Sequence, residues 1–288
     1  MNCSLSQLFI YPVKGCRGIA LSSATLAATG LEVDGIGDRE WVVVDADGEF
    51  LSQREYPRLA LVETRMTPSS LRLKAPGMLQ LDVPFESEGD VVKARVWDDT
   101  VAAVTQGEIA DAWFSNFLGV PARLLRFDPE HTRLASHKWT GKDDAPYKFA
   151  DAFPVLITGE ASLADVNARL MRGGHAAVTM ERFRPNLVLA GLAAYEEDYL
   201  KRLRIGGAAL RPVKPCARCT VPGVDLATGE ASTAVPDLLA TYRGRTQGEP
   251  QGVMFGVNAI VTDGIGRTLR VGDAVEVGAV ARLGRARR

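Results

Sequence analysis

The chain has 288 residues, with 34 Lys and Arg against 35 Asp and Glu, which gives a formal net charge of −1 at pH 7. This length suffices for two domains, or one large domain, with a full hydrophobic core. The balanced charge and an isoelectric point of about 6.3 lack the basic signature of a nucleic-acid binder, so no nucleic acid is expected as a partner. With 46% apolar and 24% charged residues, the composition is that of a globular protein.

The sequence also bears on where the protein works. No apolar stretch approaches the roughly 18 residues that a membrane span requires, so no span is expected. The first positive charge is Lys14, which is the wrong order for a secretory signal. We therefore expect a cytoplasmic protein whose four cysteines are free thiols or ligands rather than a disulfide framework.

The first part of the chain is rich in short runs of β-branched and aromatic residues separated by Gly, Pro and Asp. Strands are predicted at 8–11, 41–45, 70–74 and 91–97. Closely spaced strands with turn residues between them are typical of an antiparallel barrel or sandwich. A helix is predicted over 108–118, where Ile109, Ala112, Trp113 and Phe117 recur at helical spacing before Gly119. We place the boundary of a first, β-rich domain (1–105) just before this helix.

The second part, 106–280, is predicted to be mixed α and β, and a basic tail follows at 281–288. Residues 128–149 form a long loop of the kind that compact domains keep for function or leave disordered. Ser162 resembles a cap for a helix that carries Leu163, Val166 and Leu170 on one face and ends at Gly173. A short helix is expected around 237–242, and strands are expected at 154–157, 186–190, 252–261 and 269–277.

A Cys-x-x-Cys motif, Cys216 to Cys219, is the most informative stretch and admits four interpretations. The simplest is two buried thiols in a loop. A zinc site would need a second ligand pair, but the three histidines are scattered. A redox dithiol needs a helix N-terminus, which Pro215 and Pro222 disfavour. The fourth interpretation is one thiolate that binds a metal whose other ligands come from a cofactor.

Such a cofactor would be anionic, and four basic residues occupy strand-end or turn positions from which they could converge on it: Lys14, Arg39, Arg184 and Arg218. Lys14 precedes Gly15, where the backbone N–H groups of a turn can approach an anion. For each residue alone, a solvated charge or surface ion pair is the commoner explanation. Their combination favours a common site.

Five motifs in order carry a resemblance that covers residues 5–278. They are Tyr-Pro-Val-Lys-x-Cys-x-Gly from Tyr11, Asp-Arg-x-Trp from Asp38, Phe-Arg-Pro-Asn from Phe183, Cys-x-Arg-Cys from Cys216, and Arg-Val-Gly-Asp from Arg270. Together they resemble the MOSC-domain family, and within it the amidoxime-reducing components of mitochondria and their bacterial relatives.

The resemblance implies an α+β, β-rich fold: a MOSC N-terminal β-barrel-like domain followed by a mixed α/β MOSC barrel domain. It also implies a molybdenum cofactor, Mo-molybdopterin, between the two. Cys219 is then the thiolate ligand to molybdenum, and Cys216 is not. By the same resemblance, the residues that hold or line the cofactor are Lys14, Gly15, Arg39, Ala152, Phe153, Arg184, Ala217, Arg218 and Asn258.

The function that the resemblance implies is reduction of N-hydroxylated substrates, such as hydroxylamines, amidoximes and N-hydroxylated bases, to amines. Electrons would come from a separate flavin, haem or iron–sulfur protein. Asp225 is a candidate for proton supply, although fixing the turn that follows it is the better-supported role. Two alternatives stay open: a MOSC sulfur carrier with a persulfide on Cys219, and a protein that binds and delivers the molybdenum cofactor.

Overall fold

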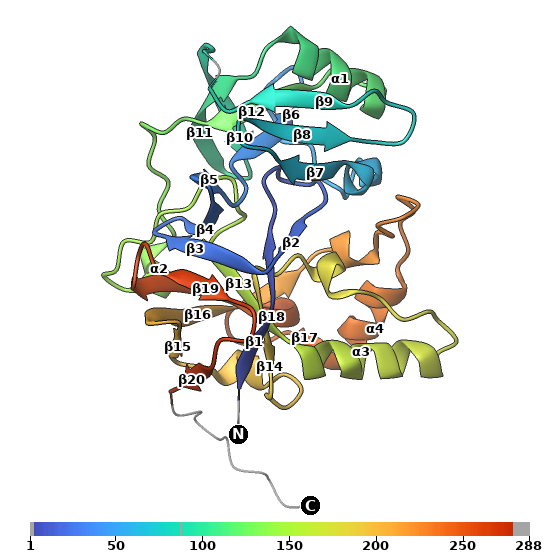
Figure 1. The fold of residues 1–288 in the computed structure, drawn as a ribbon. Coiled ribbons are helices and arrows are strands. Elements are labelled where there is room, and N and C mark those ends of the chain that lie inside the picture. The colour runs from blue at the N-terminus through green and yellow to red at the C-terminus, as the bar shows by residue number, and fades with distance from the viewer. Residues whose placement is uncertain (1–2, 87, 279–288) are drawn as a thin grey trace, which may run out of the picture.

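The largest sheet of the computed structural model, which describes residues 3–86 and 88–278, has nine strands (Figure 1). Its strands are β1 (Ser4–Ile10), β2 (Ile19–Leu21), β13 (Val155–Gly159), β14 (Leu187–Ala190), β15 (Leu203–Ile205), β16 (Ala208–Arg218), β17 (Gly244–Arg245), β18 (Gly252–Asp263) and β20 (Val275–Val277). They lie in the order β2-β1-β14-β13-β18-β16-β15-β20, and β17 also pairs with β18. The first described strand, β1, therefore belongs to the same sheet as the last one, β20.

Three smaller sheets complete the strand structure of the described residues. One contains β3 (Ser23–Ala27), β4 (Gly30–Val33), β5 (Ile36–Gly37) and β19 (Thr268–Arg270); the second contains β6 (Trp41–Val44), β10 (Val91–Val96), β11 (Asp99–Thr105) and β12 (Arg123–Phe127); the third contains β7 (Glu63–Met66), β8 (Ser70–Lys74) and β9 (Leu81–Pro84). The second and third sheets form the upper part of Figure 1, and the large sheet forms the lower part. The β-rich α+β class predicted from the sequence is confirmed. The boundary at residue 105 stays a prediction.

The helices are α1 (Glu108–Leu118), α2 (His137–Thr140), α3 (Glu160–Arg172) and α4 (Ala234–Arg243), with short 3-10 turns η1 (Pro57–Leu61), η2 (Met180–Phe183), η3 (Glu196–Tyr199) and η4 (Val221–Gly223). The predicted positions of α1, α3 and α4 are confirmed to within a few residues. Within 3–86 and 88–278, no helix combines the length and the apolar character needed to cross a membrane. The predicted basic tail, 281–288, lies outside the described residues.

Two details of the predicted helices are wrong. The buried residues of α1 are Ala110, Trp113, Phe114 and Phe117, whereas Ile109 is 78% exposed and Ala112 is exposed as well. These buried residues recur at i, i+3, i+4 and i+7 from Ala110, so the buried face is centred to one side of Ile109 and Ala112. Ser162 lies within α3 instead of capping it, because its fully buried hydroxyl donates to Glu197 Oε2 at 2.8 Å and accepts from Tyr195 N at 2.7 Å.

The predicted strands also differ from the structure in the second part of the chain, where β12, β15, β16 and β17 were not predicted and one predicted strand is divided. Strand β16 contains Pro212 and Pro215, residues that local preference disfavours in a central strand. The pairing of β16 with β18 shifts register directly after each of these prolines, and such bulges tolerate the missing N–H groups. The single strand predicted over 269–277 is two strands, β19 and β20, since a turn at Val271 and Gly272 separates them.

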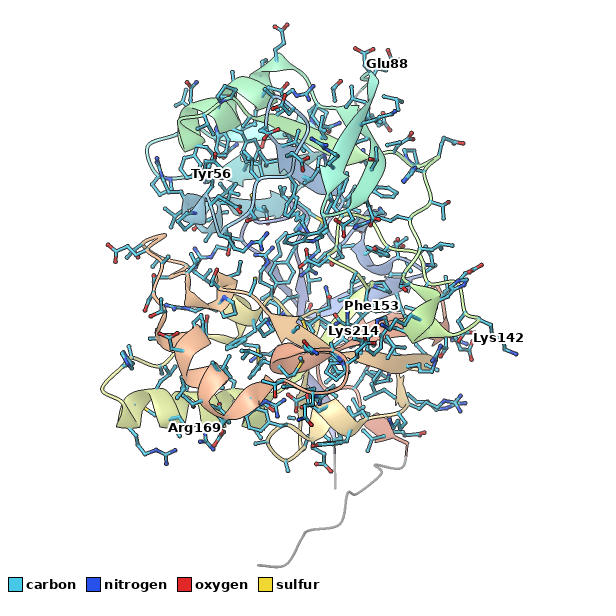
Figure 2. All side chains as sticks on the ribbon, turned by 180° about the vertical axis from the view of Figure 1, so that it is seen from behind. Tyr56, Glu88, Lys142, Phe153, Arg169 and Lys214 are labelled. Atoms are coloured by element: carbon cyan, nitrogen blue, oxygen red, sulfur yellow. The ribbon has the colours of Figure 1, made fainter. Side chains whose placement is uncertain are left out.

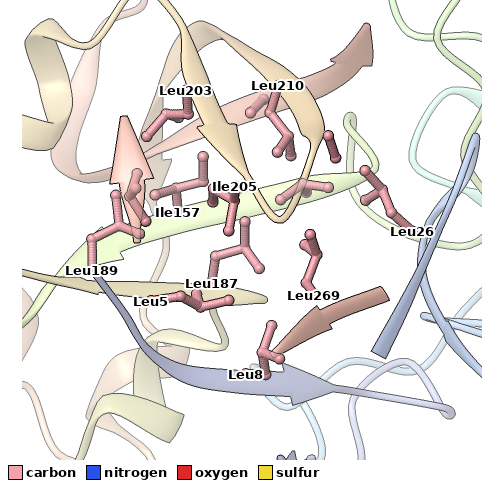
Figure 3. Packing of buried hydrophobic residues seen from close by; sticks show 14 of the residues in the cluster. Leu5, Leu8, Leu26, Ile157, Leu187, Leu189, Leu203, Ile205, Leu210 and Leu269 are labelled. Atoms are coloured by element: carbon pink, nitrogen blue, oxygen red, sulfur yellow. The ribbon is translucent and has the colours of Figure 1, made fainter. Parts of the chain in front are cut away.

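The main hydrophobic core lies between the large sheet and the sheet that contains β3 and β19 (Figure 3). Leu5 from β1, Leu26 from β3, Ile157 from β13, Leu187 from β14 and Leu269 from β19 are each fully buried in it. This core joins residues from both ends of the chain and sets the relative positions of the strand ends that carry the site described below.

We expect Leu5→Ala to lower the free energy of unfolding by about 2–5 kcal/mol, because it leaves a cavity among fully buried side chains. The matched control is Leu79→Ala, whose side chain is 86% exposed and whose loss costs about 0.5 kcal/mol or less. Urea unfolding followed by circular dichroism measures both. Equal losses in the two variants would contradict the place given to β1 in the core.

Candidate active site

Neighbouring strands of the large sheet meet the upper part of the molecule at a cavity of about 300 Å³. Asn258 of β18 pairs with Leu156 of β13 on one side and with Lys214 of β16 on the other, and all three residues line the cavity. In Figure 2, Phe153 and Lys214 lie close together near the junction of the upper and lower parts. Strand pairing therefore places this wall of the cavity.

The predicted cofactor-binding residues come together in this cavity, although they are spread over most of the chain. Those in its lining are Lys14, Gly15, Arg39, Ala152, Phe153, Arg184, Ala217, Arg218, Cys219 and Asn258. The structure thus gathers them at one place, while their roles toward a cofactor stay predictions.

Positive charge dominates the wall of the cavity. Its cationic side chains are Lys14, Arg39, Arg54, Arg184, Lys214 and Arg218, and its carboxylate among the described residues is Asp151. Cations crowded around a space with few acids raise the local concentration of anions and can pair with phosphate groups. The electrostatics of the cavity therefore favour an anionic ligand.

Lys14 follows β1 in a turn whose backbone is held by the bond from its N–H to Trp41 O, at 2.8 Å. Its buried ammonium donates to Phe149 O at 2.9 Å and to Asp151 Oδ1 at 2.5 Å. Burial lowers the pKa of Lys14, and the nearby Asp151 opposes that shift. Desolvation would raise the pKa of Asp151, but the charge and hydrogen bond of Lys14 and a bond from Trp97 hold it below its usual range. Asp151 is therefore ionised at neutral pH.

The Tyr11 ring, fully buried, lies against two guanidinium groups. The Cζ atoms of Arg39 and Arg184 are 4.4 and 4.3 Å from the ring centroid. Such cation–π contacts orient both groups and offset part of the cost of burying them together. Gly18 permits this arrangement, since a Cβ there would lie 2.4 Å from Tyr11 Cε1. Sequence reasoning assigned Tyr11 no role, although it opens the motif that contains Lys14.

Arg39 and Arg184 both have positive φ, 49° and 55°, at sharp turns ahead of strands. Arg39 pairs with Asp38 and donates to Arg184 O at 3.0 Å, and Arg184 donates to Cys16 O at 2.7 Å. Burial and the charge of Arg39 lower the pKa of Arg184 to about 10. The buried Nη2 of Arg184 has no hydrogen-bond partner within the described residues. An anion at this point would satisfy that donor and reduce the repulsion between the two cations.

The Cys-x-x-Cys motif ends β16 instead of starting a helix, as its prolines led us to expect. Arg218 donates to Cys216 Sγ at 3.1 Å and to Phe183 O at 2.8 Å, while its buried Nε has no partner in the described part of the chain. Cys219 is exposed at the cavity wall. Residues 3–86 and 88–278 contain no group of three His, Cys, Asp or Glu side chains able to hold a metal. A metal at Cys219 would need its other ligands from a cofactor.

Asp225 lies outside the lining of the cavity. Its Oδ1 accepts from the N–H groups of Ala227 at 2.9 Å and Thr228 at 3.1 Å, and its Oδ2 pairs with Arg182. These backbone hydrogen bonds lower the pKa of Asp225. The geometry thus supports the turn role for Asp225 and gives no support to proton supply.

Asn186 is a further residue that sequence reasoning did not select, although it ends the Phe-Arg-Pro-Asn motif. Its side chain is buried, and its Oδ1 accepts from Leu156 N at 3.0 Å while its Nδ2 donates to Phe9 O at 3.3 Å. These bonds connect β13 and β1 at the cavity, so Asn186 holds the strand ends together.

Residues 128–149, predicted as a long loop, contain the short helix α2 and are tied down beside the cavity. Arg133 is buried, and its Nη1 donates to Lys148 O at 3.0 Å and to Ala150 O at 2.8 Å. Ala150, the residue directly after this segment, lines the cavity. The loop thus positions the segment that contains Asp151.

Comparison with known proteins agrees with the motifs. Residues 2–121 match the MOSC N-terminal beta barrel domain and residues 144–276 match the MOSC domain. The chain is 35% identical over 282 residues to mitochondrial amidoxime reducing component 2 of Homo sapiens, which covers 94% of this chain and 82% of that protein. It is also 35% identical over 248 residues to mitochondrial amidoxime-reducing component 1 of Homo sapiens, and the match covers 83% of this chain and 72% of that protein. Component 2 of Bos taurus is 35% identical over 246 residues.

We expect iodoacetamide to modify Cys216 and Cys219 rapidly in chain produced without a cofactor, and Cys3 and Cys16 slowly. Cys16 is fully buried, and burial raises its pKa to about 12, so the reactive thiolate is scarce. Peptide mass spectrometry measures each thiol, and all four should react after denaturation. Modification of Cys16 as fast as Cys219 in the native chain would contradict the structure.

Proposed function

Because this chain belongs to the MOSC-domain family that includes the amidoxime-reducing components, we propose that it is a molybdenum-cofactor oxidoreductase that reduces N-hydroxylated substrates. The observation that carries the proposal is the cation-lined cavity with the exposed thiol of Cys219 at its wall. Its substrates are hydroxylamines, amidoximes and N-hydroxylated bases, and a separate flavin, haem or iron–sulfur protein supplies the electrons.

The residues of the cavity fit a pterin-phosphate cofactor. Lys14, Arg39 and Arg184 offer cationic donors for its phosphate, and the unpartnered Nη2 of Arg184 and Nε of Arg218 offer further N–H groups. Gly15, with φ of 85°, exposes backbone at the wall of the same cavity. When bound, the molybdenum cofactor supplies the two-electron chemistry that breaks an N–O bond.

Cys219 is the residue that would bind molybdenum, since its thiol is exposed at the cavity and a thiolate is a soft ligand. Cys216 has a different role, because its sulfur accepts the hydrogen bond from Arg218 Nη1. We assign Cys216 to holding Arg218 in place, together with the carbonyl of Phe183.

The reduction of R–NHOH to R–NH₂ consumes two electrons and two protons and releases the oxygen as water. Asp151 is the carboxylic group in the described lining, but its low pKa keeps it ionised. We therefore assign Asp151 to holding the Lys14 ammonium and Trp97, and not to donating a proton.

The test is reduction of benzamidoxime by a chemical electron donor, with Cys219→Ala beside Cys216→Ala. Loss of a residue that hydrogen-bonds to a metal ligand costs roughly 10–100-fold in metal affinity or activity. We therefore expect loss of the ligand itself in Cys219→Ala to lower turnover by at least about 100-fold. Cys216→Ala should keep most of the activity.

Equal loss in the two cysteine variants would contradict a single thiolate ligand. Bound cofactor without turnover in the parent would favour the delivery protein instead. Absence of both bound cofactor and turnover, with a persulfide on Cys219, would favour the sulfur carrier.

A further inference from the structure

A second cavity, of about 250 Å³, adjoins the first one. The linings of the two cavities share Arg54, Arg218 and Cys219. Cys219 is thus at the boundary between them, and a small molecule in the second cavity would lie next to the thiol proposed as the molybdenum ligand.

The wall of the second cavity is largely apolar on the side of α4 and β18. Pro236 and Leu239 of α4 and Val253 of β18 form this side together with Pro222 of η4, and Thr220 adds a hydroxyl group. Among the described residues its charged groups are Arg54 and Arg218, and none is a carboxylate. Apolar walls with few polar groups suit a small flat molecule, and the two guanidinium groups disfavour a cationic one.

Arg54 is held at the rim by an aromatic ring. Its guanidinium Cζ lies 4.3 Å from the ring centroid of Trp97, whose Nε1 donates to Asp151 Oδ1 at 3.0 Å. Within the described residues Arg54 is in no ion pair with a carboxylate, and its Nε makes a long bond of 3.4 Å to Ser52 Oγ. A stacked guanidinium keeps its edge N–H groups available for a bidentate carboxylate.

The backbone at Trp97 is unusual for such a side chain. Trp97 has φ of 59° and begins the two-residue turn between β10 and β11, where glycine is favoured. A bulky residue in this conformation is retained where its side chain is needed. Here that side chain connects Asp151 of the first cavity to Arg54 of the second.

We propose that the second cavity is the substrate pocket, and that it prefers N-hydroxylated compounds with a flat apolar body and a carboxylate that pairs with Arg54. The apolar side packs against the body of the substrate, and Arg54 is a specificity-determining residue. This inference rests on the proposed function, and it adds the charge and shape of the substrate.

The first test compares kcat/KM for 4-carboxybenzamidoxime and benzamidoxime. We expect the carboxylate to be preferred about fivefold or more, as for a partly exposed ion pair, and Arg54→Gln to remove the preference. The control is Arg65→Gln, an exposed arginine of β7 that lines neither cavity and should leave the preference unchanged. Turnover of both substrates with no preference would overturn the inference.

The second test does not depend on turnover, so it separates this inference from the proposed function. Calorimetry compares benzoate with benzamide, and we expect benzoate to bind about fivefold more tightly in the parent and in Arg65→Gln but not in Arg54→Gln. Thr220→Phe fills the second cavity without entering the lining of the first, so it should weaken benzoate binding while leaving the cofactor content unchanged.

Equal affinities for benzoate and benzamide, or benzoate binding that Thr220→Phe leaves intact, would overturn the substrate pocket even if benzamidoxime is reduced. Absence of turnover together with a benzoate preference that depends on Arg54 would reject the reductase and keep the anion-selective pocket.

Discussion

The mutual repulsion of six cationic side chains around one cavity is the constraint on which the rest of the site depends. Main-chain carbonyl groups hold several of them: Phe149 O accepts from Lys14, Arg184 O from Arg39, and Phe183 O from Arg218. The Tyr11 ring lies against Arg39 and Arg184. Asp151 and Asp38 pair with two of the six cations, so positive charge remains in excess at the cavity, and an anionic ligand that binds the native state should stabilise it.

The fold meets this constraint by assembling the site from distant parts of the chain. Strand β1 pairs with β14, so the turn that carries Lys14 lies beside the turn that carries Arg184. The bulges at Pro212 and Pro215 let β16 pair with β18 while it delivers Cys219 to the same cavity. The core that contains Leu5 and Leu269 keeps both ends of the chain in one unit.

The sequence was sufficient to select the site residues that stand in motifs. It was insufficient to predict the strand and the contacts that join those motifs in space. Lys14, Arg39 and Arg184 could be selected because each stands in a short motif beside a predicted strand. Strand β16 could not, since local preference disfavours Pro212 and Pro215 in a strand and only the pairing with β18 shows that bulges accommodate them. The pairing of Asp151 with Lys14 and the stacking of Arg54 on Trp97 could not be predicted for another reason: each contact joins residues that are far apart in the sequence.

The most direct measurement is the molybdenum and pterin content of the chain purified from a host that makes molybdenum cofactor. The proposed cofactor site predicts about one molybdenum and one pterin per chain, because one thiolate and one set of cations would serve a single cofactor. A known molybdenum enzyme from the same host confirms the supply. Neither molybdenum nor pterin in the purified chain, with the supply confirmed, would contradict the cofactor site.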